Sequence, residues 1–177
     1  MELYLIRHTS VAVPRGTCYG WTDVDVSENF ETEAAACKQQ LADIHFDRVY
    51  TSPLTRARKL ATYCGYPDAI WETRMKEMHM GDWEMQRFDE IKDPQLQEYY
   101  ENYLDSPTRN GESFKDLYQR VVSFLEELRG TAAANERIAV FCHGGPIICA
   151  MVYAGLVPLE QGYANIPDYA SVTRLTF

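Results

Sequence analysis

The sequence predicts an α/β protein, a three-layer α/β/α sandwich built around a mostly parallel sheet. Two apolar runs, Leu3–Ile6 and Ile138–Cys142, are too short for helices and indicate interior strands. Segments with helical periodicity separate the expected strands, which is typical of parallel βαβ units. With 177 residues and no visible internal repeat, we expect one domain over residues 1–177.

The first half of the chain predicts three strands and two helices. Ser27 is a suitable helix cap, and acidic residues in the following turns suit the positive end of a helix. Pro53 fits the first position of the next helix. The predicted order is a strand at Leu3–Ile6, an irregular loop at Val13–Asp25, a helix from Ser27 to Ile44, a strand at Asp47–Thr51, a helix from Pro53 through Ala61 and a strand at Ala69–Trp71.

The second half predicts further helices and two more strands. Residues Glu77–Trp83 are polar and have no clear period. Apolar residues at helical spacing follow Ser113, so an amphipathic helix is expected there. The remaining predictions are a helix at Phe88–Leu104 interrupted at Pro94, a strand at Arg137–Cys142, a helix begun by Pro146 and closed by Gly155, and an alternating strand at Ser171–Phe177.

Composition excludes several classes of protein. The net charge of −9 argues against a nucleic-acid partner, because phosphate backbones are bound by basic surfaces. No apolar run is long enough to cross a bilayer, and the N-terminus lacks a signal-peptide pattern. The five cysteines form no Cys-x-x-Cys pair, which favours free thiols in a reducing compartment. We therefore expect a cytoplasmic protein with neither a membrane nor a nucleic-acid partner.

Two of the predicted strands end in the same chemistry. The first delivers Arg7 and His8, and the fourth delivers His143 followed by Gly144 and Gly145. Ligands of open parallel sheets bind beyond the carboxyl ends of the strands, and a glycine-rich helix start suits an anion. The histidine pair is compatible with a metal site, a proton shuttle or a nucleophile with its partner. No spacing in the chain completes a metal coordination sphere. The alternative without a function is that Arg7 and His8 are only the polar residues at the end of an edge strand.

An arginine at the start of the second predicted helix could bind an anion at the same edge of the sheet. Arg56 follows the strand end and can reach back across the carboxyl edge of the sheet. Arg58 lies on a different helical face, so at most one of the two points into the site. A guanidinium group donates two parallel hydrogen bonds to a phosphoryl group and spreads its charge over it. The alternative is a solvated helix arginine.

Several motifs in register resemble those of a known family. The order of these motifs resembles the histidine phosphatase superfamily, also called phosphoglycerate mutase-like, and the resemblance spans nearly the whole chain. The loop Gly16–Asp23 is also similar to that of the α-ribazole phosphatases. The family motifs are Leu-Ile-Arg7-His8, Ser52-Pro-Leu-Thr-Arg56-Ala, Glu77-x-x-x-Gly81-x-Trp83-Glu84, Gly111-Glu112-Ser113 and Cys-His143-Gly144-Gly145.

The resemblance implies a phosphoglycerate mutase-like fold and a metal-independent phosphatase that needs no cofactor. His8 would attack phosphorus and form a phosphohistidine that water then hydrolyses. Glu77 would be the general acid, although without the motif it looks like a surface carboxylate. The groups implied around the phosphoryl oxygens are Arg7, Arg56, His143 and the amide of Gly144.

The substrate is expected to be a small-molecule phosphomonoester, bound in part by Thr9, Tyr19 and Trp21. Thr9 and Pro14 depart from residues common in the family, which bears on the substrate contacts of this loop. The mutases of this family are typically longer, with loops that shield the intermediate from water, and we expect this chain to be too short for them, which favours hydrolysis. Three functions remain open: dephosphorylation of α-ribazole 5′-phosphate in assembly of the cobalamin lower ligand, a broad sugar-phosphate or phosphoglycerate phosphatase, and a non-catalytic phosphoester-binding or interaction protein.

Overall fold

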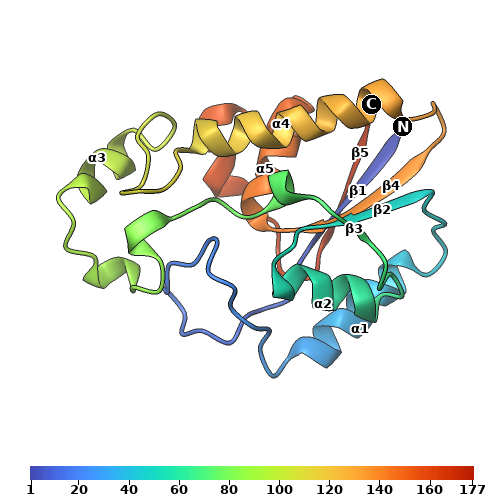
Figure 1. Ribbon diagram of the computed structural model, residues 1–177, viewed down its shortest axis with the longest axis horizontal. Coiled ribbons are helices and arrows are strands. Elements are labelled where there is room, and N and C mark those ends of the chain that lie inside the picture. Colours follow the sequence, from blue (N-terminus) through green and yellow to red (C-terminus); the bar gives the residue numbers. More distant parts are fainter.

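The computed structural model describes residues 1–177 and confirms a mostly parallel sheet between helical layers (Figure 1). The sheet order is β3-β2-β4-β1-β5, and β5 alone runs antiparallel to its neighbour. The first and fourth strands are therefore adjacent and parallel at the centre. The strands are β1 (Glu2–Arg7), β2 (Arg48–Thr51), β3 (Ile70–Trp71), β4 (Arg137–Cys142) and β5 (Val172–Thr176).

Helices cover both faces of the sheet. In Figure 1, α1 (Phe30–Leu41) and α2 (Thr55–Tyr63) lie below it, and α4 (Phe114–Thr131) and α5 (Gly144–Tyr153) lie above it. None of the helices is long and apolar enough to span a lipid bilayer. The shorter elements are α3 (Gln95–Glu101) and the 3₁₀ helices at Thr73–Met75, Gly81–Trp83, Phe88–Glu90 and Leu159–Asn165.

The alternation of side chains along the central strands builds one apolar core on each face. Leu3 and Leu5 of β1 join the core under α4 and α5, whereas Tyr4 and Ile6 join the core under α1 and α2. Successive strand residues point to opposite faces, so a strand buried on both sides reads as one continuous apolar run. This explains why such short runs predicted the strands.

The start of α1 differs from the sequence prediction. The helix begins at Phe30 with Asn29 as its cap, three residues after the expected start near Ser27. The Ser27 hydroxyl lies 2.6 Å from that of Ser10 and accepts the Asn29 amide at 3.2 Å. The Ser27 side chain therefore stabilises the turn before the helix and does not cap the helix itself.

Other helix boundaries also differ. The second helix begins at Thr55 and not at Pro53, and α5 begins at Gly144, two residues before Pro146. The expected helix at Phe88–Leu104 is divided into a 3₁₀ turn and the short α3. Pro94 precedes α3, because the proline ring restricts the residue before it to extended conformations.

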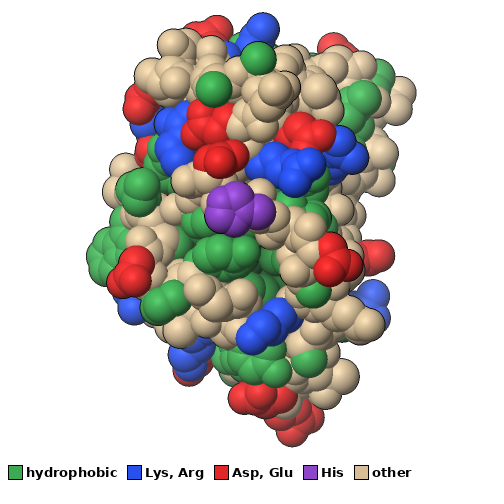
Figure 2. Space-filling model, turned by 90° about the vertical axis from the view of Figure 1, so that its right-hand side faces the viewer, with side chains coloured by type: hydrophobic (Ala, Val, Ile, Leu, Met, Phe, Trp, Pro, Cys, Tyr) green, Lys and Arg blue, Asp and Glu red, His purple; other side chains and the backbone are tan.

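The face at the N-terminal ends of the parallel strands carries charged side chains of both signs (Figure 2). Ion pairs at strand starts join Arg48 to Glu136 and Arg137 to Glu2, the latter with nitrogen and oxygen 3.0 Å apart. Basic and acidic side chains are thus interspersed on this face. The candidate chemistry lies at the opposite, carboxyl edge.

Candidate active site

The pairing of β1 with β4 brings the two predicted histidines together. Arg7 lies opposite Cys142 in the parallel register, so the residues that follow each strand are neighbours. The rings of His8 and His143 have centroids 5.1 Å apart, and both side chains are buried. Adjacent strand ends thus deliver both imidazoles to one point of the carboxyl edge.

The hydrogen bonding of His8 fixes its tautomer. Its Nδ1 lies 2.6 Å from the carbonyl oxygen of Thr9, which can only accept a hydrogen bond, so Nδ1 carries the proton. Burial, reinforced by the charge of Arg56, holds the pKa of His8 well below its usual value of 6.5. The ring is therefore neutral and presents an unprotonated Nε2, as a nucleophile requires.

Three buried nitrogens around His8 have no hydrogen-bond partner in the protein. They are Nε of Arg7, Nε of Arg56 and Nδ1 of His143. Buried donors are almost always paired, so three orphans at one edge of a sheet indicate an anion with several acceptor oxygens. Arg56 is fully buried, and its two terminal nitrogens donate to the carbonyls of Gly20 at 2.7 Å and Thr22 at 3.1 Å.

The orientation of His143 depends on a serine that the sequence analysis did not assign. Nε2 of His143 lies 2.7 Å from the Ser52 hydroxyl. Burial, with the nearby Arg56 as the next cause, holds the pKa of His143 well below 6.5. When the Ser52 hydroxyl donates to Nε2, the neutral ring carries its proton on Nδ1, which is free to donate to a phosphoryl oxygen.

Glu77 lies against the start of α5. Its Oε1 accepts the Met78 amide at 2.9 Å and its Oε2 accepts the Gly145 amide at 3.2 Å. A Cβ atom on Gly145 would lie 2.2 Å from Oε1 of Glu77, so only glycine allows this approach. A Cβ on Gly144 would lie 3.5 Å from Nε of Arg7, one of the three unpartnered nitrogens. The arginine and the carboxyl group thus lie beside the first two residues of α5.

An arginine of α4 clamps the segment that carries Glu77. Arg120 donates to the carbonyl oxygens of residues 74, 76 and 77 at 2.6, 2.7 and 2.7 Å. Its other two hydrogen bonds go to the carboxylate of Glu112 at 2.7 and 2.9 Å. Glu112 also accepts the His79 amide at 2.8 Å. All five donors of the guanidinium are used, and the backbone is fixed on both sides of Glu77.

A largely apolar cavity of about 250 Å³ opens beside Glu77. Arg7 and Glu77 are the only charged residues that line it. Tyr19 lies on its wall, and the Tyr19 hydroxyl lies 2.9 Å from that of Tyr169, whose ring packs 4.0 Å from the Arg7 guanidinium. The other lining residues are Thr17, Met78, Met80, Phe88, Tyr99, Gly144, Gly145, Ile148, Tyr163 and Ile166.

The other two predicted substrate contacts lie outside this lining. The side chain of Thr9 is fully buried, and the residue acts through its carbonyl oxygen on His8. The indole of Trp21 stacks on His79 with centroids 4.4 Å apart, and its Nε1 donates to the Glu77 carbonyl at 2.7 Å. Trp21 therefore braces the Glu77 segment, and its contact with substrate stays a prediction.

Sequence reasoning missed Ser52, Arg120, Gly145 as a contact of Glu77, and Tyr169. Ser52 and Gly145 stand inside motifs that were noted, so motif position was a usable signal for them. Nothing local marks Arg120 or Tyr169, because their partners lie 43 and 150 residues away in the chain. Such residues become visible only when the fold is known.

Comparisons with known proteins identify the family to which the chain is similar. The family model for the histidine phosphatase superfamily (branch 1) matches residues 3–177. Phosphoserine phosphatase 1 of Hydrogenobacter thermophilus is 30% identical, with 86% of this chain and 76% of that protein covered. A 2,3-bisphosphoglycerate-dependent phosphoglycerate mutase of Methylobacterium sp. is 32% identical, with 84% and 79% covered.

A solved structure supports the fold. The crystal structure of a candidate α-ribazole-5′-P phosphatase from Escherichia coli K-12 has a TM-score of 0.88 and 23% sequence identity to this chain. The similarity covers 98% of this chain and 89% of the other. At this identity the similarity establishes the shared architecture.

Proposed function

This chain belongs to the histidine phosphatase superfamily (branch 1), a family of phosphatases and mutases, and we propose that it hydrolyses phosphomonoesters through a phosphohistidine on His8. The three unpartnered nitrogens around a neutral His8 are the observation that carries the proposal. A phosphoryl group has the acceptor oxygens to pair with all of them.

The first step is transfer of the phosphoryl group to His8. Nε2 attacks phosphorus, an N–P bond forms and the P–O bond to the leaving alcohol breaks. Glu77 gives its proton to the leaving oxygen, which departs as a neutral alcohol. Arg7, Arg56 and His143 hold the phosphoryl oxygens and spread the charge of the transition state.

The second step returns the enzyme to its starting state. Water attacks phosphorus of the phosphohistidine, and the Glu77 carboxylate takes the proton of that water. The N–P bond breaks, inorganic phosphate leaves and His8 keeps the proton on Nδ1 that it bonds to Thr9. Each residue ends in the protonation state in which it began.

The cavity favours a neutral, partly aromatic leaving group. Neither phosphoserine nor phosphoglycerate would find a cation there for its carboxylate, because Arg7 is the only basic residue in the lining and it belongs to the phosphoryl site. Methionine and aromatic side chains suit a flat apolar ring. We propose α-ribazole 5′-phosphate as the substrate, which would place the enzyme in assembly of the cobalamin lower ligand.

The test is phosphate release from a panel of substrates, measured as kcat/KM. The panel contains α-ribazole 5′-phosphate, sugar phosphates, phosphoglycerates, phosphoserine and an aryl phosphate. A strong preference for α-ribazole 5′-phosphate is expected. A flat profile would withdraw that substrate and keep the mechanism, and a preference for phosphoserine or phosphoglycerate would refute the reasoning from the cavity.

Trapping the intermediate tests the mechanism separately. Rapid quench without acid, followed by mass spectrometry, should find one phosphoryl group on His8 during turnover. A chain that binds phosphate esters but neither turns them over nor becomes phosphorylated would instead be a non-catalytic relative.

A further inference from the structure

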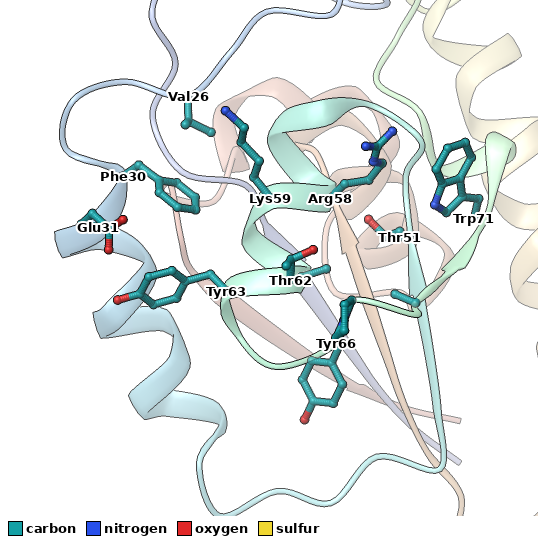
Figure 3. A pocket seen from close by; sticks show the side chains of 13 residues that line it. Val26, Phe30, Glu31, Thr51, Arg58, Lys59, Thr62, Tyr63, Tyr66 and Trp71 are labelled. Atoms are coloured by element: carbon teal, nitrogen blue, oxygen red, sulfur yellow. The ribbon is translucent and has the colours of Figure 1, made fainter.

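A second, larger cavity lies away from the catalytic edge. It has a volume of about 560 Å³ and shares no lining residue with the cavity beside Glu77. Figure 3 shows that it extends over the outer face of α2, between the start of α1 and the short strand β3. Its volume lies in the range typical of small-molecule sites.

Aromatic rings form the walls of this cavity. Phe30 and Tyr63 stand on the α1 side and contact each other edge to face, with centroids 5.6 Å apart. Trp71 stands on the opposite wall, and the residue is 62% exposed. Tyr66 lies between the two walls. Such rings offer a planar ligand broad apolar faces at low entropic cost.

The floor of the cavity carries positive charge. Arg58 makes no hydrogen bond or ion pair through its side chain, and its guanidinium lies 4.7 Å from the centre of the Trp71 ring. Lys59 pairs with Asp25 at 2.6 Å, but both side chains are about half exposed, so the pair is weak and exchangeable. Glu31 is the only acidic residue in the lining.

We propose that this cavity binds a planar aromatic anion of nucleotide type. The ring would stack beside Trp71 and the aromatic wall, and the anionic group would pair with Arg58 and, after release from Asp25, with Lys59. The Arg58 guanidinium has no carboxylate partner, so the anionic group of a ligand can pair with it. A ligand that brings both a ring and a negative charge satisfies the two features together.

The cavity and the catalytic site share two structural elements. Thr51 of β2 lines the cavity, and the next residue, Ser52, bonds His143. On α2, Arg56 faces the phosphoryl site, and Arg58 faces the cavity. The proposed ligand would thus bind on the outer side of the helix that carries a phosphate-binding arginine on its inner side.

Calorimetric titration with adenosine 3′,5′-cyclic monophosphate tests the proposal. This probe has a planar ring and one negative charge, and it is a phosphodiester, which the proposed monoesterase does not hydrolyse. The titration is run first without inorganic phosphate and then with it, because phosphate occupies the catalytic site. We expect one site with a Kd below about 1 mM, and Arg58→Gln should weaken binding at least about tenfold.

Arg129→Gln is the matched control, because it removes one positive charge from an exposed site outside the cavity and should leave binding unchanged. Phosphatase activity of Arg58→Gln on an aryl phosphate should also be unchanged, which reports that the variant is folded. Absence of saturable binding, binding that survives Arg58→Gln, or displacement of the probe by phosphate would each overturn the proposal. A dimer in equilibrium sedimentation that becomes a monomer in Trp71→Ala would overturn it as well.

Discussion

Replacing Arg120 with methionine is expected to impair proton transfer by Glu77 more than any other step. Arg120 does not line the catalytic cavity, so its effect must pass through the backbone that it holds. Its guanidinium bonds three carbonyl oxygens between residues 74 and 77. Methionine keeps much of the length and apolar contact of the side chain and removes all five donors.

The structure sets the size of both expected effects. Glu112 would keep its bond from the His79 amide but lose its cation, at a site where each side chain is 17% exposed. Breaking a buried ion pair costs about 3–5 kcal/mol, and partial exposure reduces this to about 2–3 kcal/mol of unfolding free energy. A shift of about 1 Å in the Glu77 carboxyl costs about 10²-fold in rate.

The assay compares two classes of substrate. An alkyl phosphate needs a proton on its leaving oxygen, so kcat/KM should fall about 10²-fold, which is about 2.7 kcal/mol of transition-state stabilisation. An aryl phosphate with an acidic phenol leaves without that proton, so the fall should be less than about tenfold. Glu77→Gln should also lower kcat/KM more for the alkyl than for the aryl phosphate. Because it removes the proton donor itself, its loss is the largest that Arg120→Met can reach by this route.

Arg129→Met on the same helix is the control, because Arg129 donates to Tyr153 and touches no part of the Glu77 segment. It should change neither rate. Equal losses for alkyl and aryl substrates in Arg120→Met would refute the positioning role and indicate general disruption. A lowered melting temperature with an unchanged ratio of alkyl to aryl kcat/KM would also refute the positioning role.

Three further predictions follow from the site. His8→Ala should abolish turnover and the phosphoprotein seen by rapid quench, and near-normal activity would refute the nucleophile. In NMR, the His8 ring should titrate below pH 6.5. Below pH 6.5 the unfolded chain binds more protons at this residue than the folded chain does, so the free energy of unfolding should fall as the pH drops. A His8 titration midpoint above pH 6.5 would contradict this. Gly145→Ala should lower kcat/KM for alkyl phosphates about 10²-fold, since its Cβ overlaps the general acid, whereas Gly130→Ala meets no atom within 4 Å and should leave activity intact.

The sequence predicted the fold and the strand-end residues because both depend on local patterns. A strand buried on both faces needs an apolar run, and the first polar residues after it must emerge at the sheet edge. His8 and His143 follow from that rule, and the arrangement of helices around the sheet follows from the alternation of elements. Helix starts were less accurate, since Ser27 bonds Ser10 across a loop that no local pattern reveals.

The position of Glu77 could not be derived from its surroundings in the sequence. Its segment has no regular period, and its geometry depends on Arg120 and Trp21, which lie 43 and 56 residues away. Only the order of family motifs pointed to it. The aromatic residues were ambiguous for the same reason: Trp21 and Tyr19 are close in sequence, yet one braces the backbone and the other lines the cavity.

The three unpartnered nitrogens around His8 also make folding sensitive to the product of the proposed reaction. The folded chain holds buried donors without acceptors, which costs stability that the unfolded chain does not lose. Inorganic phosphate that binds only the folded chain would recover it, by about 2.7 kcal/mol at a hundredfold excess over its Kd. The melting temperature would then rise with the concentration of free phosphate.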